Sequence, residues 1–369
     1  MGFAKNSRLA HRTEIIGRTV KSCLKNSPAT LANSNRTRLD YATMSIRLGL
    51  IGCGEHSEIG HAIPLVRYAA AHPEMIVLAA ACDLRRERAE MFCHKYGFAR
   101  PYEQADDILA KEHLDVCIAV MPVEYISEIG MKLLQAKMPC LVEKPLGTTI
   151  AEARRLLEAA KTTGTTNMVS VNRRFMPLLN RGVEWAKVAG TLRYMRCAMF
   201  RHARPEPDFL RFTAIHAVDT MRFIGGEVRA SEIRALTSAP PHWYAIDLQF
   251  KNGVQGRIDV LPTAGLVEET YELAGDGFRA VITSPFGPRR SLRGYRENQL
   301  VLEEMAGSET PEDVTQGFYG ETTALIEALR DGKPPKPSIE DVFPSVELCF
   351  QLADHAEKNA STHRVSSAR

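Results

Sequence analysis

The chain has 369 residues, a length typical of two domains, and its 44% hydrophobic and 25% charged residues are ordinary for a globular protein. The net charge of +3 arises in residues 1–44, which hold eight Lys or Arg and two acids, so the remainder has 39 basic and 42 acidic residues. This balance gives no indication of a nucleic acid partner. No apolar run is long enough to span a membrane, which argues against a membrane protein.

Eight cysteines are scattered along the chain without a CxxC pair, and several lie within apolar runs. They are typical of reduced core residues, so we expect a cytoplasmic protein without a disulfide framework. Cys53 and His56 lie in one short segment, but two such ligands without a third do not make a metal site. The sequence therefore predicts no metal.

Residues 1–44 are rich in Arg, Lys, Ser, Thr and Asn and lack apolar periodicity. Organelle transit peptides share this composition. The alternatives are a disordered extension and a start codon assigned too far upstream, because Met44 directly precedes the first apolar strand. We expect a disordered extension over 1–44 and place the beginning of the fold at residue 45.

The first strand, Ile46–Ile51, runs into a glycine turn at Gly52 and Gly54, and a helical pattern begins near Gly60. A glycine turn between a strand and a helix lets the backbone approach a pyrophosphate, which the helix N-terminus stabilises. Ser57 occupies the third glycine position of this fingerprint, so the motif is incomplete.

A second strand, Met75–Cys82, ends in Asp83. A carboxylate at this strand end can accept hydrogen bonds from the adenosine ribose hydroxyls, which favours NAD over NADP. Arg85 and Arg86 follow directly, and the alternative is that they bind the ribose phosphate of NADP. We favour NAD.

Strands and helices alternate as far as residue 172, which predicts a Rossmann-type doubly wound parallel sheet over residues 45–172. The predicted elements after Asp83 are a helix at 85–96, strand Leu114–Val120, helix Val123–Ala136, strand 139–142, helix Ile150–Thr162 and strand Val169–Val171. The strand at 139–142 ends in Glu143-Lys144-Pro145. Because ligands bind beyond the carboxyl ends of such strands, Lys144 is a candidate for the chemistry, and the alternative is a surface ion pair beside a turn proline.

Residues 173–369 form the second predicted domain, in which strands follow one another without intervening helices. Lys251-Asn252-Gly253 between two strands is typical of a hairpin, so we expect an open-faced antiparallel sheet. The predicted strands are Leu192–Arg201, Glu232–Leu236, Trp243–Phe250, Val254–Leu261, Glu268–Ala274 and Phe278–Thr283. Two closing helices are expected at about 312–331 and 338–357.

His216 lies in an apolar helical segment from Phe212 to Gly225, with Asp219 three residues later. A single histidine in such a helix is usually a satisfied core residue, and its alternative role is to exchange a proton near neutral pH. Asp219 is a candidate for a carboxylate that orients the histidine, and the alternative is that at this spacing it caps or pairs within the helix.

The order of these motifs resembles the glucose-fructose oxidoreductase / inositol dehydrogenase / MocA family over residues 46–357. The motifs that carry the resemblance are Gly52-Cys53-Gly54, Asp83, Met121-Pro122, Glu143-Lys144-Pro145 and Asn172-Arg173-Arg174-Phe175 with Pro177. The resemblance implies that Lys144 lies beside the nicotinamide and the reacting hydroxyl, and that His216 is an active-site histidine. It also implies that the closing helices brace the first domain and that the open sheet face packs against another subunit or domain, and we expect a homo-dimer or homo-tetramer.

Two departures from the family pattern concern the site. Met121-Pro122-Val123 and Ile126 replace the usual Thr-Pro-Asn and following histidine, which predicts a more apolar nicotinamide pocket. Phe212 replaces an aspartate one helical turn before His216. The carboxylate that would orient this histidine is therefore missing.

The leading hypothesis is an NAD(P)-dependent oxidoreductase that acts on a polyol, cyclitol or sugar-derived hydroxyl. The predicted site residues are Lys144 and His216 for catalysis; Gly52, Gly54, Ser57, Asp83, Pro122, Glu143 and Lys144 for cofactor binding; and Lys144, Arg173, His216 and Asp219 for substrate binding. The alternatives are a glycosidase of the same fold that uses NAD transiently, and a non-catalytic regulator that binds nucleotide and sugar.

Overall fold

The computed structural model describes residues 45–287 and 289–366, so the extension predicted for residues 1–44 lies outside the described residues. The described chain forms two compact units. The first comprises residue 45 to Glu143, Glu158–Met168 and Thr322–Lys336, and the second comprises Lys144–Leu157, Val169–Glu321 and the chain from Pro337 onward. The chain passes between the units several times, whereas the sequence analysis places one boundary after residue 172.

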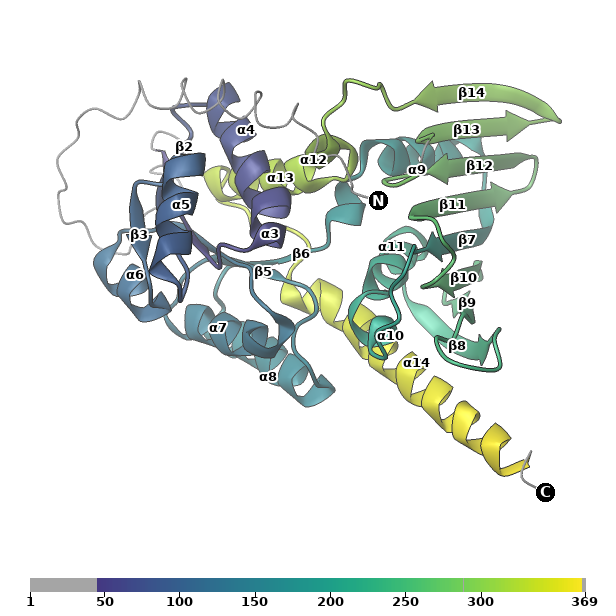
Figure 1. The fold of residues 1–369 in the computed structure, drawn as a ribbon. Coiled ribbons are helices and arrows are strands. Elements are labelled where there is room, and N and C mark those ends of the chain that lie inside the picture. Colours follow the sequence, from purple (N-terminus) through teal and green to yellow (C-terminus); the bar gives the residue numbers. More distant parts are fainter. Residues whose placement is uncertain (1–44, 288, 367–369) are drawn as a thin grey trace, which may run out of the picture. The chain divides into compact units, whose positions relative to one another are not determined.

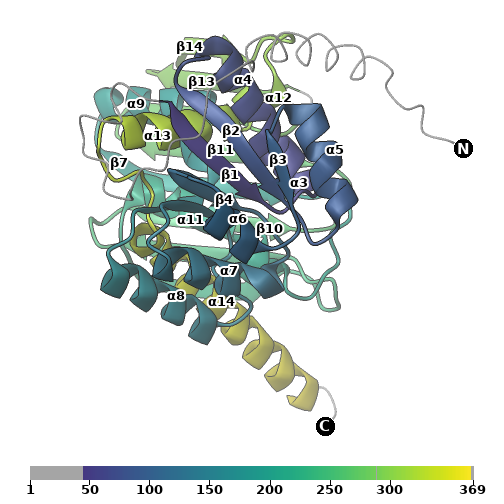
Figure 2. The same ribbon diagram turned by 90° about the vertical axis from the view of Figure 1, so that its left-hand side faces the viewer.

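A six-stranded sheet has the order β3-β2-β1-β4-β5-β6, which is the order of a doubly wound nucleotide-binding domain (Figures 1 and 2). The pairs from β3 to β5 are all parallel. The strands are β1 (Ile46–Ile51), β2 (Ile76–Cys82), β3 (Arg100–Tyr102), β4 (Val116–Ala119), β5 (Cys140–Glu143) and β6 (Asn167–Ser170). Every residue of β4 and β5 is buried, as expected for parallel strands covered on both faces. The predicted fold class is confirmed.

The helices of this part of the chain follow the predicted alternation with some corrections. They are α3 (Glu55–Ser57), the π-helix η1 (Glu58–Ala62), α4 (Ile63–Ala71), α5 (Arg86–Tyr96), α6 (Ala105–Lys111), α7 (Val123–Gln135) and α8 (Ile150–Thr163). Helical structure begins at Glu55, not near Gly60, because a short α-turn and a π-turn precede the regular helix. The sequence analysis misses β3 and α6, which are only three and seven residues long.

The second sheet has eight strands in the order β14-β13-β12-β11-β7-β10-β9-β8. They are β7 (Leu192–Phe200), β8 (Val228–Ala235), β9 (Tyr244–Phe250), β10 (Gln255–Leu261), β11 (Glu268–Gly275), β12 (Phe278–Thr283), β13 (Ser291–Arg296) and β14 (Gln299–Met305). Its pairs are antiparallel except for β7 with β10, so the sheet is mostly antiparallel. The sequence analysis misses β13 and β14, where Gly294 and a register shift interrupt the strand pattern.

Three helices, α9 (Pro177–Ala189), α11 (Ile215–Gly225) and α14 (Ile339–Ser366), pack on one face of this sheet (Figure 1). Close contact depends on glycine, since a Cβ at Gly182 would lie 2.8 Å from Ile282 and one at Gly225 would lie 2.8 Å from Phe250. The other face carries ion pairs such as Arg196 with Asp259. One covered and one open face is the predicted arrangement.

The closing segment contains α12 (Glu312–Thr315), α13 (Phe318–Arg330) and α14, where the sequence predicts two helices. The break between α12 and α13 is at Gly317, whose φ is +87° and where a Cβ would lie 2.1 Å from the Asn172 carbonyl oxygen. Only glycine fits this approach to the 3₁₀ turn η2 (Asn172–Phe175). Among the described helices, none is both long enough and apolar enough to cross a membrane.

Candidate active site

The glycine turn lies between the end of β1 and the helix that follows. Gly52 has a φ of +97°, and a Cβ there would lie 1.7 Å from the Val120 carbonyl oxygen, so no other residue fits between β1 and β4. Gly54 caps α3, and a Cβ there would meet no atom within 4 Å. β1 and β4 flank the point where the strand order reverses, which is where dinucleotides bind in this fold.

Ser57, at the third glycine position of the fingerprint, is almost fully buried in α3. Its hydroxyl oxygen has no hydrogen-bond partner among the described residues. A buried hydroxyl without a partner costs free energy unless a ligand or water satisfies it. The third glycine position is therefore occupied by a buried hydroxyl that the described residues leave unsatisfied.

Asp83 joins the end of β2 to the glycine turn. Its Oδ2 accepts a hydrogen bond of 2.9 Å from the backbone N–H of Cys53, and its Oδ1 accepts one of 3.0 Å from that of Arg85. The guanidinium of Arg86 pairs with Glu90 at 2.8 Å, one turn along α5. A carboxylate fixed beside the turn favours ribose hydroxyls over a ribose phosphate, because like charges repel.

Pro122 stands at the N-terminus of α7, directly after β4, as its motif predicts. The chain is extended at this residue, with φ of −53° and ψ of 145°, and the helix begins at Val123. This position belongs to the same reversal point of the sheet as the glycine turn.

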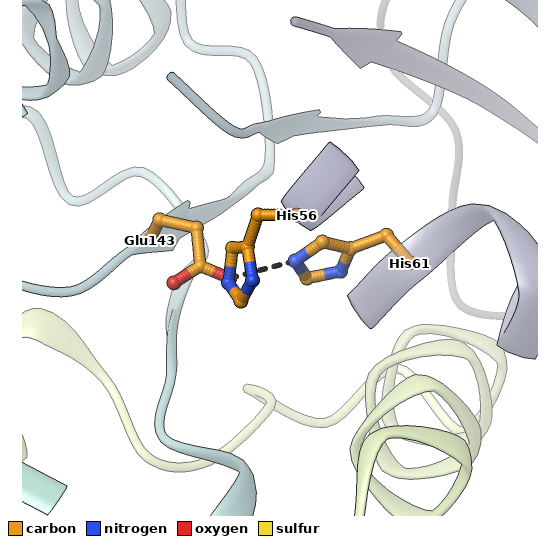
Figure 3. Close-up of side chains that lie close together, drawn as sticks. All are labelled: His56, His61 and Glu143. Carbon is orange, nitrogen blue, oxygen red and sulfur yellow. Dashed lines mark hydrogen bonds and ion pairs between the residues drawn. The ribbon is translucent and has the colours of Figure 1, made fainter. Parts of the chain in front are cut away.

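Glu143, the last residue of β5, binds two histidines through one oxygen (Figure 3). Its Oε1 lies 2.7 Å from Nε2 of His61 and 3.1 Å from Nε2 of His56. Burial alone would raise the pKa of the Glu143 carboxyl, but the charges and hydrogen bonds of the two histidines outweigh it and hold the pKa well below its ordinary value.

The sequence analysis does not identify His61, because residues five apart point to different sides of a regular α-helix. In η1 the backbone N–H of Ile63 donates to the carbonyl of Glu58, five residues earlier. This π-turn changes the helical spacing, and His56 and His61 reach the same carboxylate. Single π-turns inside helices are frequent at functional sites, but no simple sequence periodicity indicates this one, so the sequence offers no signal for His61.

Lys144, the first residue of the second unit, is held by the segment that precedes His216. Its Nζ donates a hydrogen bond of 3.3 Å to the carbonyl oxygen of Phe212, the last residue of α10 (Phe209–Phe212). His216 is the second residue of α11, and its backbone N–H donates to the carbonyl of Thr213. The two predicted catalytic residues are thus positioned by one short segment of the second unit.

Phe212 replaces the family aspartate, and its ring packs against Phe350 of α14 with ring centroids 6.4 Å apart. The Phe212 side chain therefore has a packing role. The backbone carbonyl of the same residue is the acceptor for Lys144. The contact of the lysine with this position does not require a carboxylate.

Asp219 and Arg173, both predicted to bind substrate, are buried and occupied by other residues of the second unit. Asp219 accepts two hydrogen bonds from the Arg174 guanidinium, at 2.8 and 2.7 Å, and one from the Ser345 hydroxyl at 2.7 Å. Arg173 donates to both oxygens of Glu269, at 3.0 and 2.9 Å. These contacts favour structural roles, because a substrate would have to displace buried ion pairs.

Three further arginines of the second unit, Arg201, Arg204 and Arg211, are also paired. Arg201 binds Glu269, Arg204 binds Glu206, and Arg211 binds Asp208 and Asp354. Pairing between neighbouring elements, which sequence spacing does not reveal, accounts for most of this group.

Comparison with known proteins finds similarity in the first part of the chain and along most of its length. Residues 46–172 match the model of an oxidoreductase family with an NAD-binding Rossmann fold. A myo-inositol 2-dehydrogenase of Thermotoga maritima is 24% identical over 324 residues, which cover 80% of this chain and 92% of that protein.

Two solved structures show the same fold. A dehydrogenase from Chromobacterium violaceum aligns with a TM-score of 0.78 at 16% identity, over 88% of this chain and 99% of that one. A levoglucosan dehydrogenase in complex with NADH and L-sorbose aligns with a TM-score of 0.71 at 17% identity, over 85% and 97% of the two chains. The family match over residues 46–172 and the similarity to the myo-inositol 2-dehydrogenase along most of the chain support the resemblance to the glucose-fructose oxidoreductase / inositol dehydrogenase / MocA family of NAD-binding oxidoreductases.

Proposed function

We propose that this protein is an NAD-dependent dehydrogenase that oxidises or forms a hydroxyl of a polyol, cyclitol or sugar derivative. The observation that carries the proposal is the combination of a glycine turn that only glycine can form, at Gly52, with Asp83 fixed beside it. The relatives support the substrate class, since one acts on myo-inositol and another is a levoglucosan dehydrogenase.

The residues of the first unit fit a dinucleotide. Open space at Gly54 suits the close approach of a pyrophosphate, and the buried hydroxyl of Ser57 lacks a protein partner among the described residues. The Asp83 carboxylate would accept hydrogen bonds from the ribose hydroxyls, which supports NAD over NADP. When bound, the nicotinamide supplies the hydride acceptor or donor.

Lys144 would stabilise the negative charge that develops on the reacting hydroxyl, and His216 would accept its proton. An ammonium near the hydroxyl oxygen stabilises negative charge that develops as the proton leaves. A neutral carbonyl is a weaker partner for an ammonium than a carboxylate, so the bond to Phe212 holds Lys144 while leaving it able to interact with a substrate. The imidazole of His216 is the proposed proton acceptor.

The test is a screen of polyols, cyclitols and sugars with the full chain and NAD, followed by the ultraviolet absorbance of NADH. We expect NADH to form with at least one compound of these classes. Cleavage of a glycoside without accumulation of NADH would support the NAD-using glycosidase in its place. If NAD binds but neither reaction occurs with any compound, the proposed function is wrong and a binding role remains.

A further inference from the structure

We propose that His56, His61 and Glu143 form a binding site for one divalent transition-metal ion, with Zn²⁺ as the best match. The three side chains offer two imidazole nitrogens and one carboxylate oxygen that all lie within 4.8 Å of one another (Figure 3). This combination of ligands is one that zinc prefers. The sequence predicts no metal because it brings His56 together with Cys53 alone.

The distances suit a common ion. Two ligands of a tetrahedral zinc, each at its usual bond length, lie about 3.3 Å apart. The observed separations from Oε1 of Glu143 are 3.1 Å to His56 and 2.7 Å to His61. An ion would lengthen the separation between Glu143 and His61 by about 0.6 Å and, through side-chain rotation, would draw together the two imidazole nitrogens, which lie within 4.8 Å of each other.

Both imidazoles approach the same carboxylate oxygen, so the three ligand atoms form a compact triangle. An arrangement with one ring on each oxygen would separate the rings and leave no point near all three. The rings meet edge to face, with centroids 6.2 Å apart, and their nitrogens converge (Figure 3). One ion can therefore contact all three.

The backbone presents these ligands from rigid elements. Glu143 ends a fully buried strand, and the π-turn η1 carries His61 to the carboxylate that His56 also reaches. A π-turn is less stable than regular helix and is kept where it serves a function. All three residues belong to the first unit.

Burial differs among the ligands in a way that allows an ion to enter. His61 and Glu143 are 1% and 3% exposed, whereas the His56 side chain is 53% exposed. Three protein ligands would leave a fourth position of a tetrahedral ion for water or for an oxygen of a small ligand, as in zinc sites that bind substrate.

The test is titration of the full chain with Zn²⁺ alone, after dialysis against a chelator, with metal content and affinity as readouts. We expect one ion per chain and a dissociation constant below about 1 µM. Co²⁺ substitution should give the intense visible absorption of a tetrahedral site.

Three variants assign the ion to this cluster. His61→Gln and Glu143→Gln should each weaken Zn²⁺ binding by about 100-fold or more, and His56→Gln by about 10-fold or more, since loss of a ligand costs at least as much as loss of its supporting contact. His94→Gln, an exposed histidine of α5 outside the cluster, is the matched control and should leave affinity unchanged. Circular dichroism establishes that each variant folds, and the exposed position of His56 keeps one variant informative if the buried ones do not fold.

Absence of stoichiometric binding by folded wild-type protein would overturn the proposal. Binding that His56→Gln leaves undiminished would also overturn it, because the ion would then lie elsewhere. NAD affinity measured on the same samples separates this result from the proposed function, which requires NAD binding and does not require the metal.

Discussion

Two of the buried carboxylates in the described part of the chain differ in the partners they hold. Glu143, in the first unit, binds two imidazoles, and Glu269, in the second, binds two guanidiniums. Burial raises the pKa of each carboxyl, and in each case the partners outweigh it, so that both pKa values are lowered. Both carboxyls thus have a lowered pKa, one through imidazole partners and the other through guanidinium partners.

The two clusters differ in whether the partners of the carboxylate can still exchange a proton or bind a metal. Arginine stays charged and donates in a fixed planar geometry, so the cluster of Glu269 with Arg173 and Arg201 is complete as it stands. An imidazole can exchange a proton or bind a metal, and His56 in addition reaches solvent. Glu143 at the end of β5 thus has partners that can still react, whereas the partners of Glu269 are charged side chains held within the core.

If Glu269 is structural, its removal should have the largest effect on stability. Glu269→Ala leaves two buried guanidiniums without their carboxylate and should lower the free energy of unfolding by roughly 3–5 kcal/mol. The measurement is urea denaturation, with Glu303→Ala as the control, because Glu303 pairs with Arg293 at the surface and its loss should cost at most about 1 kcal/mol. Equal effects of the two substitutions would contradict the structural role.

If the end of β5 is the reactive region, Lys144→Ala should reduce kcat by about 1,000-fold, or about 4 kcal/mol, through loss of charge stabilisation and proton exchange. NAD affinity should change by less than about threefold, since the turn at Gly52 is intact. Lys132→Ala is the matched control, because that ammonium pairs with Asp106 at the surface. Unchanged kcat in the Lys144 variant would remove this residue from the mechanism.

Acid should weaken the Glu269 cluster in a predictable direction. Burial alone would raise the pKa of Glu269. The charges and hydrogen bonds of Arg173 and Arg201 outweigh this effect, so the pKa falls from 4.5 to about 2. A carboxyl with a lowered folded pKa stabilises the fold above its unfolded pKa, and that contribution is lost as the pH falls toward the folded value. Between about pH 5 and pH 3 we expect a loss of about 2 kcal/mol from this group.

Denaturation of the wild type and of Glu269→Gln at both pH values isolates that contribution from those of other carboxyls. The variant should lose less stability on acidification than the wild type. An identical loss in both proteins would mean that Glu269 does not titrate in this range.

The smallest predicted effect concerns Asp83, which is fixed to the glycine turn but does not take part in the reaction. Asp83→Asn removes the charge while keeping an acceptor, and should weaken NAD binding by about 10-fold and reduce discrimination against NADP. Calorimetry measures both affinities. Asp106→Asn, an exposed acid of the first unit, should change neither, and an unaltered NAD affinity in the Asp83 variant would exclude the ribose contact.

The fold and the nucleotide turn are predictable from the sequence because their signals are local. Fully apolar strands such as β4, and the glycine required at Gly52, impose conformation on their own residues. The ends of β1 and β5 then follow from the order of the parallel strands. The sequence therefore places Lys144 and Asp83 at or next to the ends of strands without knowledge of their contacts.

The partners of buried charges are not predictable in this way. The pairing of Arg173 with Glu269 joins residues 96 positions apart, and that of His61 with Glu143 joins residues 82 positions apart. Such pairs depend on tertiary packing and, for His61, on a π-turn that no simple periodicity indicates. The sequence consequently assigns Arg173 to substrate binding and overlooks His61.

The most direct test of the account is calorimetric titration of the full chain with NAD and with NADP. The account predicts one NAD bound per chain and an affinity for NADP at least about 10-fold weaker, because the Asp83 carboxylate repels a ribose phosphate. Binding of neither nucleotide by folded protein, or a preference for NADP, would contradict it.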